Sequence, residues 1–157
     1  MMRVLHFGLW ISNAYHNTVG RFDQYMLPFY RKDIERGELT REQALILIED
    51  FFYSFNRDSD QFVTYVGNNG QSLMLGGCKP DGSDAYNELT ELCLEASLHN
   101  RCIDPKINLR VNKNTPLSVY EFCTKLTKQG LGFPQYANDD VVIPALVNWG
   151  YDIEDAR

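Results

Sequence analysis

Apolar side chains recur at helical spacing over the first part of the chain. In residues 4–14, and again in residues 22–29, they stand three or four positions apart, which places them on one face of a helix. The pattern predicts a helical segment from Val4 to about Arg36, interrupted near Gly20 and Pro28.

A second helix has a clear start signal. The sequence Thr40-Arg41-Glu42-Gln43 has the form of a capping box, in which the threonine hydroxyl accepts a hydrogen bond from a later main-chain amide and the glutamine side chain reaches back. We expect this helix to run to about Asn56. Residues 57–70 are polar and contain glycine and asparagine, which predicts a long loop.

Three later segments have the pattern of short strands. Gln71–Leu75 is an apolar run closed by two glycines, and residues 134–138 are another candidate. The segment Lys106–Asn112 alternates strictly, so one of its faces is apolar and the other polar. The polar face carries Asn108, Arg110 and Asn112.

Helices are predicted between and after these strands. Ser83 or Asp84 is the expected cap of the first helix, and Pro116 is the expected first residue of the second. Asp139 or Asp140 is the expected cap of the last. Strands joined by helical crossovers form parallel sheets, so the predicted fold class is α/β: a helix-rich start followed by β-α-β-α-β-α units with parallel strands.

The polar face of the strand at 106–112 has two explanations. Parallel strands are normally buried on both sides. Polar side chains there indicate either an edge strand that faces water or the wall of a barrel whose interior holds a polar substrate. In α/β folds, ligands bind at the carboxyl ends of the strands, where Gly76-Gly77 and residues 138–140 stand, although these also fit a plain turn and a helix cap.

Composition narrows the possible partners. The chain has 157 residues, is 44% hydrophobic and carries a formal net charge of −6. This composition is typical of one globular domain and opposes a nucleic-acid or anionic-membrane surface. No apolar run approaches the ~20 residues of a membrane span, and no signal-peptide pattern opens the sequence. We expect no nucleic acid and no membrane as partner, and a cytoplasmic location.

Common catalytic and metal-binding motifs are not found in the sequence. Its four cysteines fit neither a zinc pattern nor a disulfide framework, which predicts reduced thiols. No histidine and carboxylate spacing for a metal, no Gly-x-Ser-x-Gly elbow and no phosphate-binding glycine loop occurs. Ser12, Asn13 and His16 share one helical face by their spacing, but a structural histidine is the favoured interpretation. We expect no bound metal.

Longer strings carry more specific information. They are GRFDQYM at 20–26 with PFY at 28–30, LTREQA at 39–44, LGG at 75–77, DGSDA at 81–85 with NEL at 87–89, NKNTP at 112–116, and YANDD at 136–140 with IPAL at 143–146. In this order they resemble an interior stretch of the glycyl radical enzymes of the pyruvate formate-lyase type. The likeness runs from about Ser12 to Arg157.

This resemblance implies both a fold and an activity. Members of the family fold as a ten-stranded α/β barrel of two parallel halves, and this chain would be the part just before the catalytic-cysteine loop. An activating enzyme that uses S-adenosylmethionine and an iron–sulfur cluster installs a glycyl radical, which then generates a thiyl radical on the cysteine. The full-length protein would have this activating enzyme and a small polar organic substrate as partners. It would be a radical lyase, dehydratase or decarboxylase, or a formate acetyltransferase-like enzyme.

Two elements of the family do not occur in residues 1–157: the catalytic cysteine, expected just past Arg157, and the Arg-Val-x-Gly-like string that carries the radical. We therefore assign no catalytic residue and no bound cofactor to this chain. We expect one partial domain over residues 1–157 that is inactive alone and self-associates through exposed apolar surface. A non-catalytic scaffold or binding fragment of the same family is the alternative.

Candidate substrate contacts come from two arguments. The resemblance points to residues 12–16, to residues 70–72 and to Tyr136 or Gln135, which would face the barrel interior. The alternation of the strand at 106–112 adds its polar side chains. The predicted substrate-binding residues are Ser12, Asn13, His16, Gly70, Gln71, Ser72, Asn108, Arg110 and Tyr136.

Overall fold

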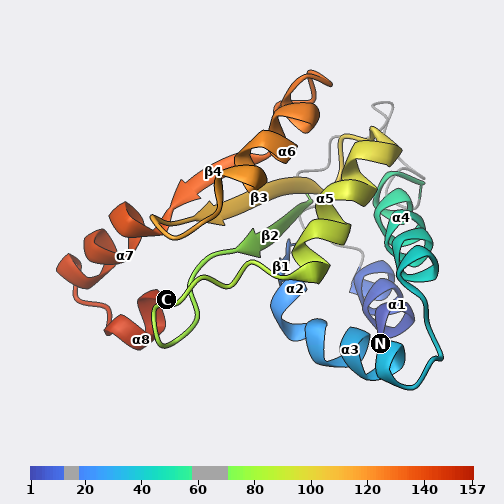
Figure 1. Ribbon diagram of the computed structural model, residues 1–157, viewed down its shortest axis with the longest axis horizontal. Helices are drawn as coiled ribbons and strands as arrows, with labels where there is room; N and C mark the ends of the chain where they lie inside the picture. Colours follow the sequence, from blue (N-terminus) through green and yellow to red (C-terminus); the bar gives the residue numbers. More distant parts are fainter. Residues whose placement is uncertain (13–17, 58–70) are drawn as a thin grey trace.

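The computed structural model describes residues 1–12, 18–57 and 71–157. Figure 1 shows the sheet between a group of amino-terminal helices and the two carboxyl-terminal helices. The elements are α1 (Met2–Ser12), β1 (Thr18–Arg21), α2 (Phe22–Tyr25), α3 (Leu27–Glu35), α4 (Arg41–Arg57), β2 (Ser72–Gly76), α5 (Glu88–Asn100), β3 (Lys106–Val111), α6 (Leu117–Thr127), β4 (Gln135–Asn138), α7 (Asp139–Asn148) and α8 (Ile153–Ala156).

Within the described ranges, the strands form one four-stranded sheet in the order β1-β2-β3-β4. Each neighbouring pair is parallel. Helix α5 connects β2 to β3, and α6 connects β3 to β4. The predicted α/β class with parallel strands joined by helices is therefore confirmed.

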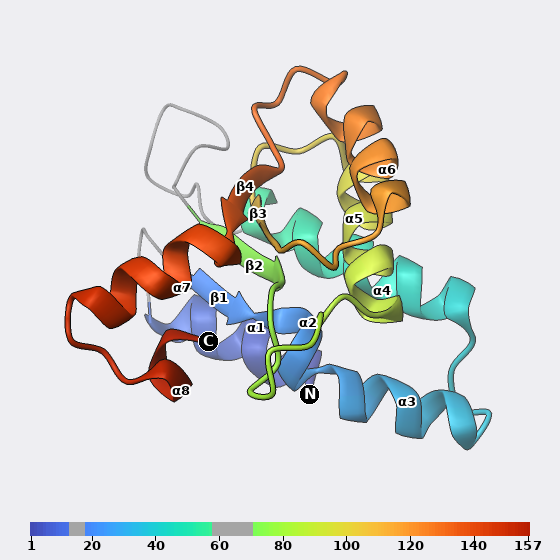
Figure 2. The same ribbon diagram turned by 60° about the vertical axis from the view of Figure 1, so that its left-hand side comes forward.

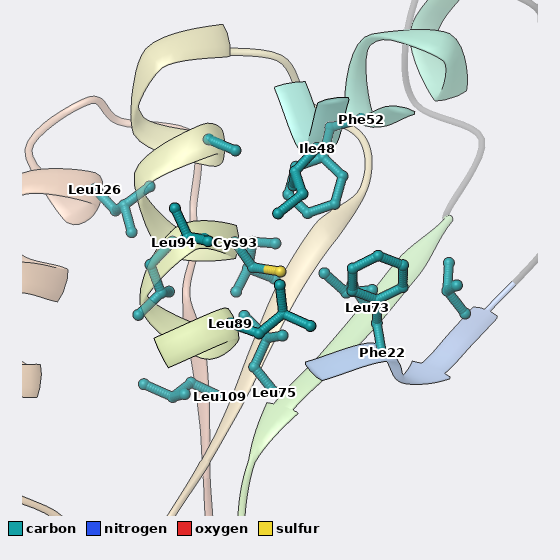
Figure 3. Close-up of a cluster of buried hydrophobic side chains, with 14 of the residues drawn as sticks. Phe22, Ile48, Phe52, Leu73, Leu75, Leu89, Cys93, Leu94, Leu109 and Leu126 are labelled. Atoms are coloured by element: carbon teal, nitrogen blue, oxygen red, sulfur yellow. The ribbon is translucent and has the colours of Figure 1, made fainter. Parts of the chain in front are cut away.

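The main core lies between one face of the sheet and the helices. Leu73 and Leu75 of β2 stand opposite Ile107 and Leu109 of β3 in the register, and each of these side chains is at most 1% exposed. Figure 3 shows Leu73, Leu75 and Leu109 against α5, with the sulfur of Cys93 among carbon side chains. The predicted apolar face of β3 is the face that packs on the helices.

The start of α4 has the predicted capping box. The Gln43 amide donates to Thr40 Oγ1 at 3.2 Å, and the Thr40 amide donates to Gln43 Oε1 at 2.9 Å. These two bonds satisfy main-chain amides that have no partner within the first turn of a helix. The predicted interruption near Pro28 is also present, as the boundary between α2 and α3.

The predicted interruption of the helical segment near Gly20 is present, but residues 18–21 form a strand there, β1, which was not predicted. This strand pairs with β2, with Thr18 opposite Ser72 and Arg21 opposite Met74. The register is irregular between them, where Gly20 has a φ of +64°. A strand this short has too few residues to show a periodicity, and its pairing with a distant strand leaves no local signal.

Two predicted helix caps are also wrong. Helix α5 is capped by Asn87, whose side chain accepts from the amides of Leu89 and Thr90, and not by Ser83 or Asp84. Helix α7 is capped by Asn138, which accepts from the Asp140 amide at 3.0 Å. Asparagine is as good a cap as aspartate. Which residue becomes the cap therefore depends on where the preceding strand or turn ends.

The described residues contain no helix that is long and apolar enough to cross a membrane. The same residues contain no cluster of three or more histidine, cysteine or acidic side chains that could hold a metal ion.

The cysteines all lie in described segments and are free thiols. Cys78, Cys93 and Cys123 are buried, whereas Cys102 is partly exposed. Burial raises the pKa of each thiol above its ordinary value, to about 11 for Cys123. A thiol with a raised pKa and little exposure forms little of the reactive thiolate near neutral pH.

We expect one fast-reacting thiol per folded chain with 5,5′-dithiobis(2-nitrobenzoate) at about pH 7.5, below the ordinary cysteine pKa of about 8.5. Cys102→Ser should remove that reaction, and Cys123→Ser should leave it unchanged. Unfolding in denaturant should expose all four thiols. Fast reaction of two or more thiols in the folded protein would contradict this reading of their environments.

Candidate functional site

Charged and polar groups meet where the strands end. Arg21 closes β1, Arg110 stands one residue before the end of β3, and Asp139 follows β4 directly. Gly77 and Cys78 follow β2. Parallel strands bring their carboxyl ends to one edge of the sheet, which is the usual ligand side of α/β folds. We call these five residues the strand-end cluster.

Arg110 and Asp139 form an ion pair in this cluster, with the carboxylate buried and the guanidinium partly buried. Arg110 Nε donates to Asp139 Oδ1 at 2.7 Å, and the two side chains are 15% and 1% exposed. Among the described residues, Asp139 Oδ2 is buried without a hydrogen-bond partner. Cys78 lies beside this carboxylate, which adds to burial in raising the pKa of the thiol. The pair ties β3 to the first turn of α7, where the helix dipole also favours a carboxylate.

Arg21 binds main-chain oxygens, one of which belongs to Arg157, the last residue of the sequence. Its Nη2 donates to the carbonyls of Gly76 at 2.7 Å and Cys78 at 3.0 Å, and its Nη1 donates to the carbonyl of Arg157 at 3.3 Å. Burial lowers the pKa of Arg21, and the nearby Arg110 lowers it further. The guanidinium therefore joins β1, the turn after β2 and the residue that follows α8.

Gly76 and Gly77 make this crowding possible. Their φ angles are +68° and +90°, values that glycine adopts far more readily than other residues. A Cβ on Gly76 would lie 2.7 Å from the Arg110 carbonyl oxygen, and one on Gly77 would lie 2.9 Å from Arg110 Nε and 3.1 Å from Arg21 Nη2. The two guanidinium groups thus lie over a main chain that has no side chain to hold them away.

Asp23 anchors the turn from the helix side of the sheet. Its Oδ2 accepts from the Gly76 amide at 2.8 Å and from Thr90 Oγ1 at 2.5 Å, and the residue is fully buried. Burial raises the pKa of this carboxyl, while the two hydrogen bonds oppose that rise. Helices α2 and α5 are thereby fixed to the end of β2.

Arg21 and Asp23 were not among the predicted site residues. Both belong to the GRFDQYM string, but the helical expectation for this segment gave them no common partner. The feature of the sequence that could have indicated them is a pair of opposite charges on either side of Phe22. Phe22 has no exposed surface in the structure. Charged residues are almost never buried unless they are paired.

Several predicted site residues share the polar face of the sheet. Ser72 stands on the same strand face as Met74, which is opposite Asn108, and Asn108 is opposite Gln135. Successive residues of a strand point to alternate faces, so Ser72, Asn108 and Arg110 lie on one face. Ser72 and Asn108 are partly exposed, and both are neutral hydrogen-bonding groups.

Tyr136 lies on the opposite face from these residues. It stands opposite Leu109 in the register, and its ring stacks on that of Tyr120 of α6 with centroids 6.0 Å apart. Gln135, the alternative at this strand, lies on the face of Asn108 instead.

The remaining predicted residues are distributed as follows. Gln71 is buried, and its carbonyl accepts from the Lys106 amide at 2.8 Å. Ser12 ends α1, but its side chain is not described. Asn13, His16 and Gly70 lie outside the described residues.

Gly77→Ala is expected to destabilise the fold by about 1–3 kcal/mol more than Gly130→Ala. Both glycines have positive φ, +90° and +76°, so both alanines carry a left-handed penalty of about 1–2 kcal/mol. An added Cβ meets nothing within 4 Å at Gly130, whereas at Gly77 it meets the two guanidinium groups. Urea unfolding of both variants measures the difference in their free energies of unfolding. Equal losses in the two variants would show that the crowding at Gly77 does not affect stability.

Comparison with known proteins gives the chain its relatives. The family model described as "Pyruvate formate lyase-like" matches residues 1–157. The (2S)-3-sulfopropanediol dehydratase of Klebsiella oxytoca is 34% identical over 153 residues, which cover 93% of this chain and 18% of the relative. The chain thus spans about a fifth of the length of that enzyme. Other relatives are named as a sulfite-lyase and as the glycyl radical subunit of a decarboxylase.

Solved structures agree with these sequence matches. A structure described for 1,2-propanediol dehydration in Roseburia inulinivorans superposes with a TM-score of 0.78 at 37% identity, over 87% of this chain and 17% of that one. The hydroxyproline dehydratase of Clostridioides difficile, solved with trans-4-hydroxy-L-proline bound, gives 0.78 at 30% identity, over 88% and 18%. The chain belongs to the pyruvate formate lyase-like family of glycyl radical enzymes.

Proposed function

We propose that residues 1–157 are the segment of a glycyl radical enzyme that forms part of its substrate-binding barrel wall. The enzyme would be a radical lyase, dehydratase or decarboxylase that acts on a small polar organic molecule. The observation that carries this proposal is the match of the family model to the whole of this chain, with dehydratases among the relatives. Within the segment, the polar face of β2, β3 and β4 is the surface suited to such a substrate.

The proposed substrate contacts are neutral hydrogen-bonding groups on that face. Ser72 and Asn108 are partly exposed and offer one hydroxyl and one amide. The relatives named above include enzymes of propanediols and hydroxyproline, and hydroxyl groups are bound well by such side chains. Arg110 would contribute through the nitrogens that do not bind Asp139. Ser12, Asn13, His16, Gly70 and Gln71 remain proposed contacts on the family resemblance alone. On β4 the proposed contact is Gln135, because Tyr136 lies on the helix face.

The radical chemistry would come from outside these residues. A glycyl radical, installed by an activating enzyme that uses S-adenosylmethionine and an iron–sulfur cluster, would supply hydrogen abstraction from the substrate through the thiyl form of the catalytic cysteine. The described residues would bind and orient the substrate and exclude water from it. The segment alone is proposed to be inactive, since neither the catalytic cysteine nor the radical glycine string occurs in its sequence.

The second candidate is a non-catalytic scaffold or binding fragment from the same family. The observation in its favour is the closed packing of the main core, in which Phe22, Leu73 and Leu92 have no exposed surface. A segment with its own core can fold and bind a partner without the remaining barrel. The mass of the natural protein separates the two candidates.

The first test is the intact mass of the protein expressed from its own gene, followed by activation. We expect a mass several-fold above 18.1 kDa, a glycyl radical signal by electron paramagnetic resonance after activation, and turnover of a small hydroxylated substrate. Asn108→Ala should raise the KM of that reaction about threefold to tenfold, the usual cost of one hydrogen bond. The matched variant Asn114→Ala, at an exposed position, should leave it within about twofold.

A natural mass near 18.1 kDa without a radical signal would refute the enzyme proposal and favour the scaffold candidate. An unchanged KM in Asn108→Ala would refute the assignment of the substrate to this sheet face.

The isolated 157-residue chain is expected to self-associate at micromolar concentration. The segment from α7 to α8 exposes large apolar side chains, including Val142 at 41% and Trp149 at 79%, and such patches mark interaction surfaces. Sedimentation velocity should show species beyond the monomer. The double variant Val142→Ser/Trp149→Ser should shift them toward monomer, while Tyr53→Ser on α4, at 52% exposure, should not. A single monomeric species for the unmodified chain would contradict this expectation.

A further inference from the structure

Arg21 connects parts of the chain that are far apart in sequence. Its guanidinium donates to Gly76 and Cys78, which follow from β2, and to the carbonyl of Arg157, which stands 136 residues later. All three acceptors are main-chain oxygens. The contact therefore fixes the path of the backbone rather than the position of another side chain.

Residues 153–157 have few other attachments among the described residues. Ala156 packs in a small apolar cluster with Cys78 and Ile143. The Arg157 side chain donates to the Pro80 carbonyl at 2.5 Å and lies over Gly82, where an added Cβ would come within 3.2 Å of it. Every one of these partners, apart from Ile143, belongs to the segment just after β2. In Figure 2, α8 and the carboxyl end of the chain lie beside the loop after β2.

The chemistry of this contact suits arginine in particular. A guanidinium is a planar group with five N–H donors in a fixed fork, so it can bind carbonyls in several directions at once. A lysine ammonium is a compact point charge that cannot reproduce this spacing. Arg21 also lies next to Arg110, a second positive charge. The carboxylates of Asp23 and Asp139 oppose this repulsion, because their negative charges favour the charged form of Arg21.

We propose that Arg21 is a positioning residue that fixes the main chain at Arg157 over the carboxyl ends of β1 and β2. The residues that follow Arg157 in a longer chain then enter the strand-end region from a fixed point and in a fixed direction. This inference rests on the proposed function for its catalytic consequence, because a cysteine loop is expected to follow there. The contact between Arg21 and the main chain at Arg157 lies within residues 1–157 and does not depend on that function.

The test is hydrogen–deuterium exchange of the natural full-length chain with Arg21→Lys. Within residues 153–157 we expect the exchange of the Ala156 amide, which donates to the Asp152 carbonyl at 3.0 Å, to rise about tenfold, the effect of losing one or two hydrogen bonds from a charged donor. Exchange in α5 should change by less than about twofold. The matched control is Arg31→Lys, an exposed arginine that pairs with Glu88 at 2.6 Å, and it should leave residues 153–157 unchanged.

Unchanged protection of residues 153–157 in Arg21→Lys would overturn the proposal. A parallel loss of protection in α5, or an unfolded variant, would also overturn it, because Arg21 would then serve the whole fold.

Kinetics of the natural enzyme give a second readout. Arg21→Lys should lower kcat at least about tenfold with KM within about twofold, since a displaced loop impairs the reacting groups more than substrate binding. An unchanged kcat would refute the catalytic consequence. If the natural protein has no radical activity, the proposed function fails, and the exchange experiment still decides the structural part.

Discussion

The structure depends on one close approach, at the end of β2. There the backbone turns at Gly76 and Gly77 with positive φ, Asp23 holds the turn from the helix side, and the guanidinium groups of Arg21 and Arg110 lie over it. Any side chain at Gly77 would separate those two groups. Because β2 is an inner strand of the sheet, this turn is the point at which the ends of β1 and β3 can be brought together.

The charges in this region are arranged to hold backbone. Asp139 binds Arg110 and so fixes the start of α7 on β3. Arg21 binds the main-chain oxygens of Gly76 and Arg157. Burying such groups is costly unless each has partners. The two guanidinium groups and the two carboxylates here each have such partners, and most of these partners are main-chain groups or lie on another element.

Local patterns predicted the elements that local physics determines. The alternation in β3 and the capping box of α4 were recognised because the signals lie within a few residues of one another. The sequence pointed to Gly77, Arg110 and Asp139 of the strand-end cluster. It did not point to Arg21, because Arg21 and Arg110 become neighbours only through the order of the strands. Tyr136 shows the same limit on a smaller scale. The predicted strand began at 134 and the observed one at Gln135, and a sequence without a clear alternation does not say which residue faces the helices.

The two faces of the sheet differ in what they could bind. The helix face is filled by side chains such as Leu73 and Ile107 that have no exposed surface, so it offers no room for a ligand. On the polar face, the charged groups near the strand ends already bind each other or the backbone. Ser72 and Asn108 lie on the same face, farther from the carboxyl ends of the strands, and both are neutral and partly exposed. A molecule bound there would be recognised by hydrogen bonds to hydroxyl or amide groups rather than by paired charges, which is the reason to test hydroxylated substrates before strongly anionic ones.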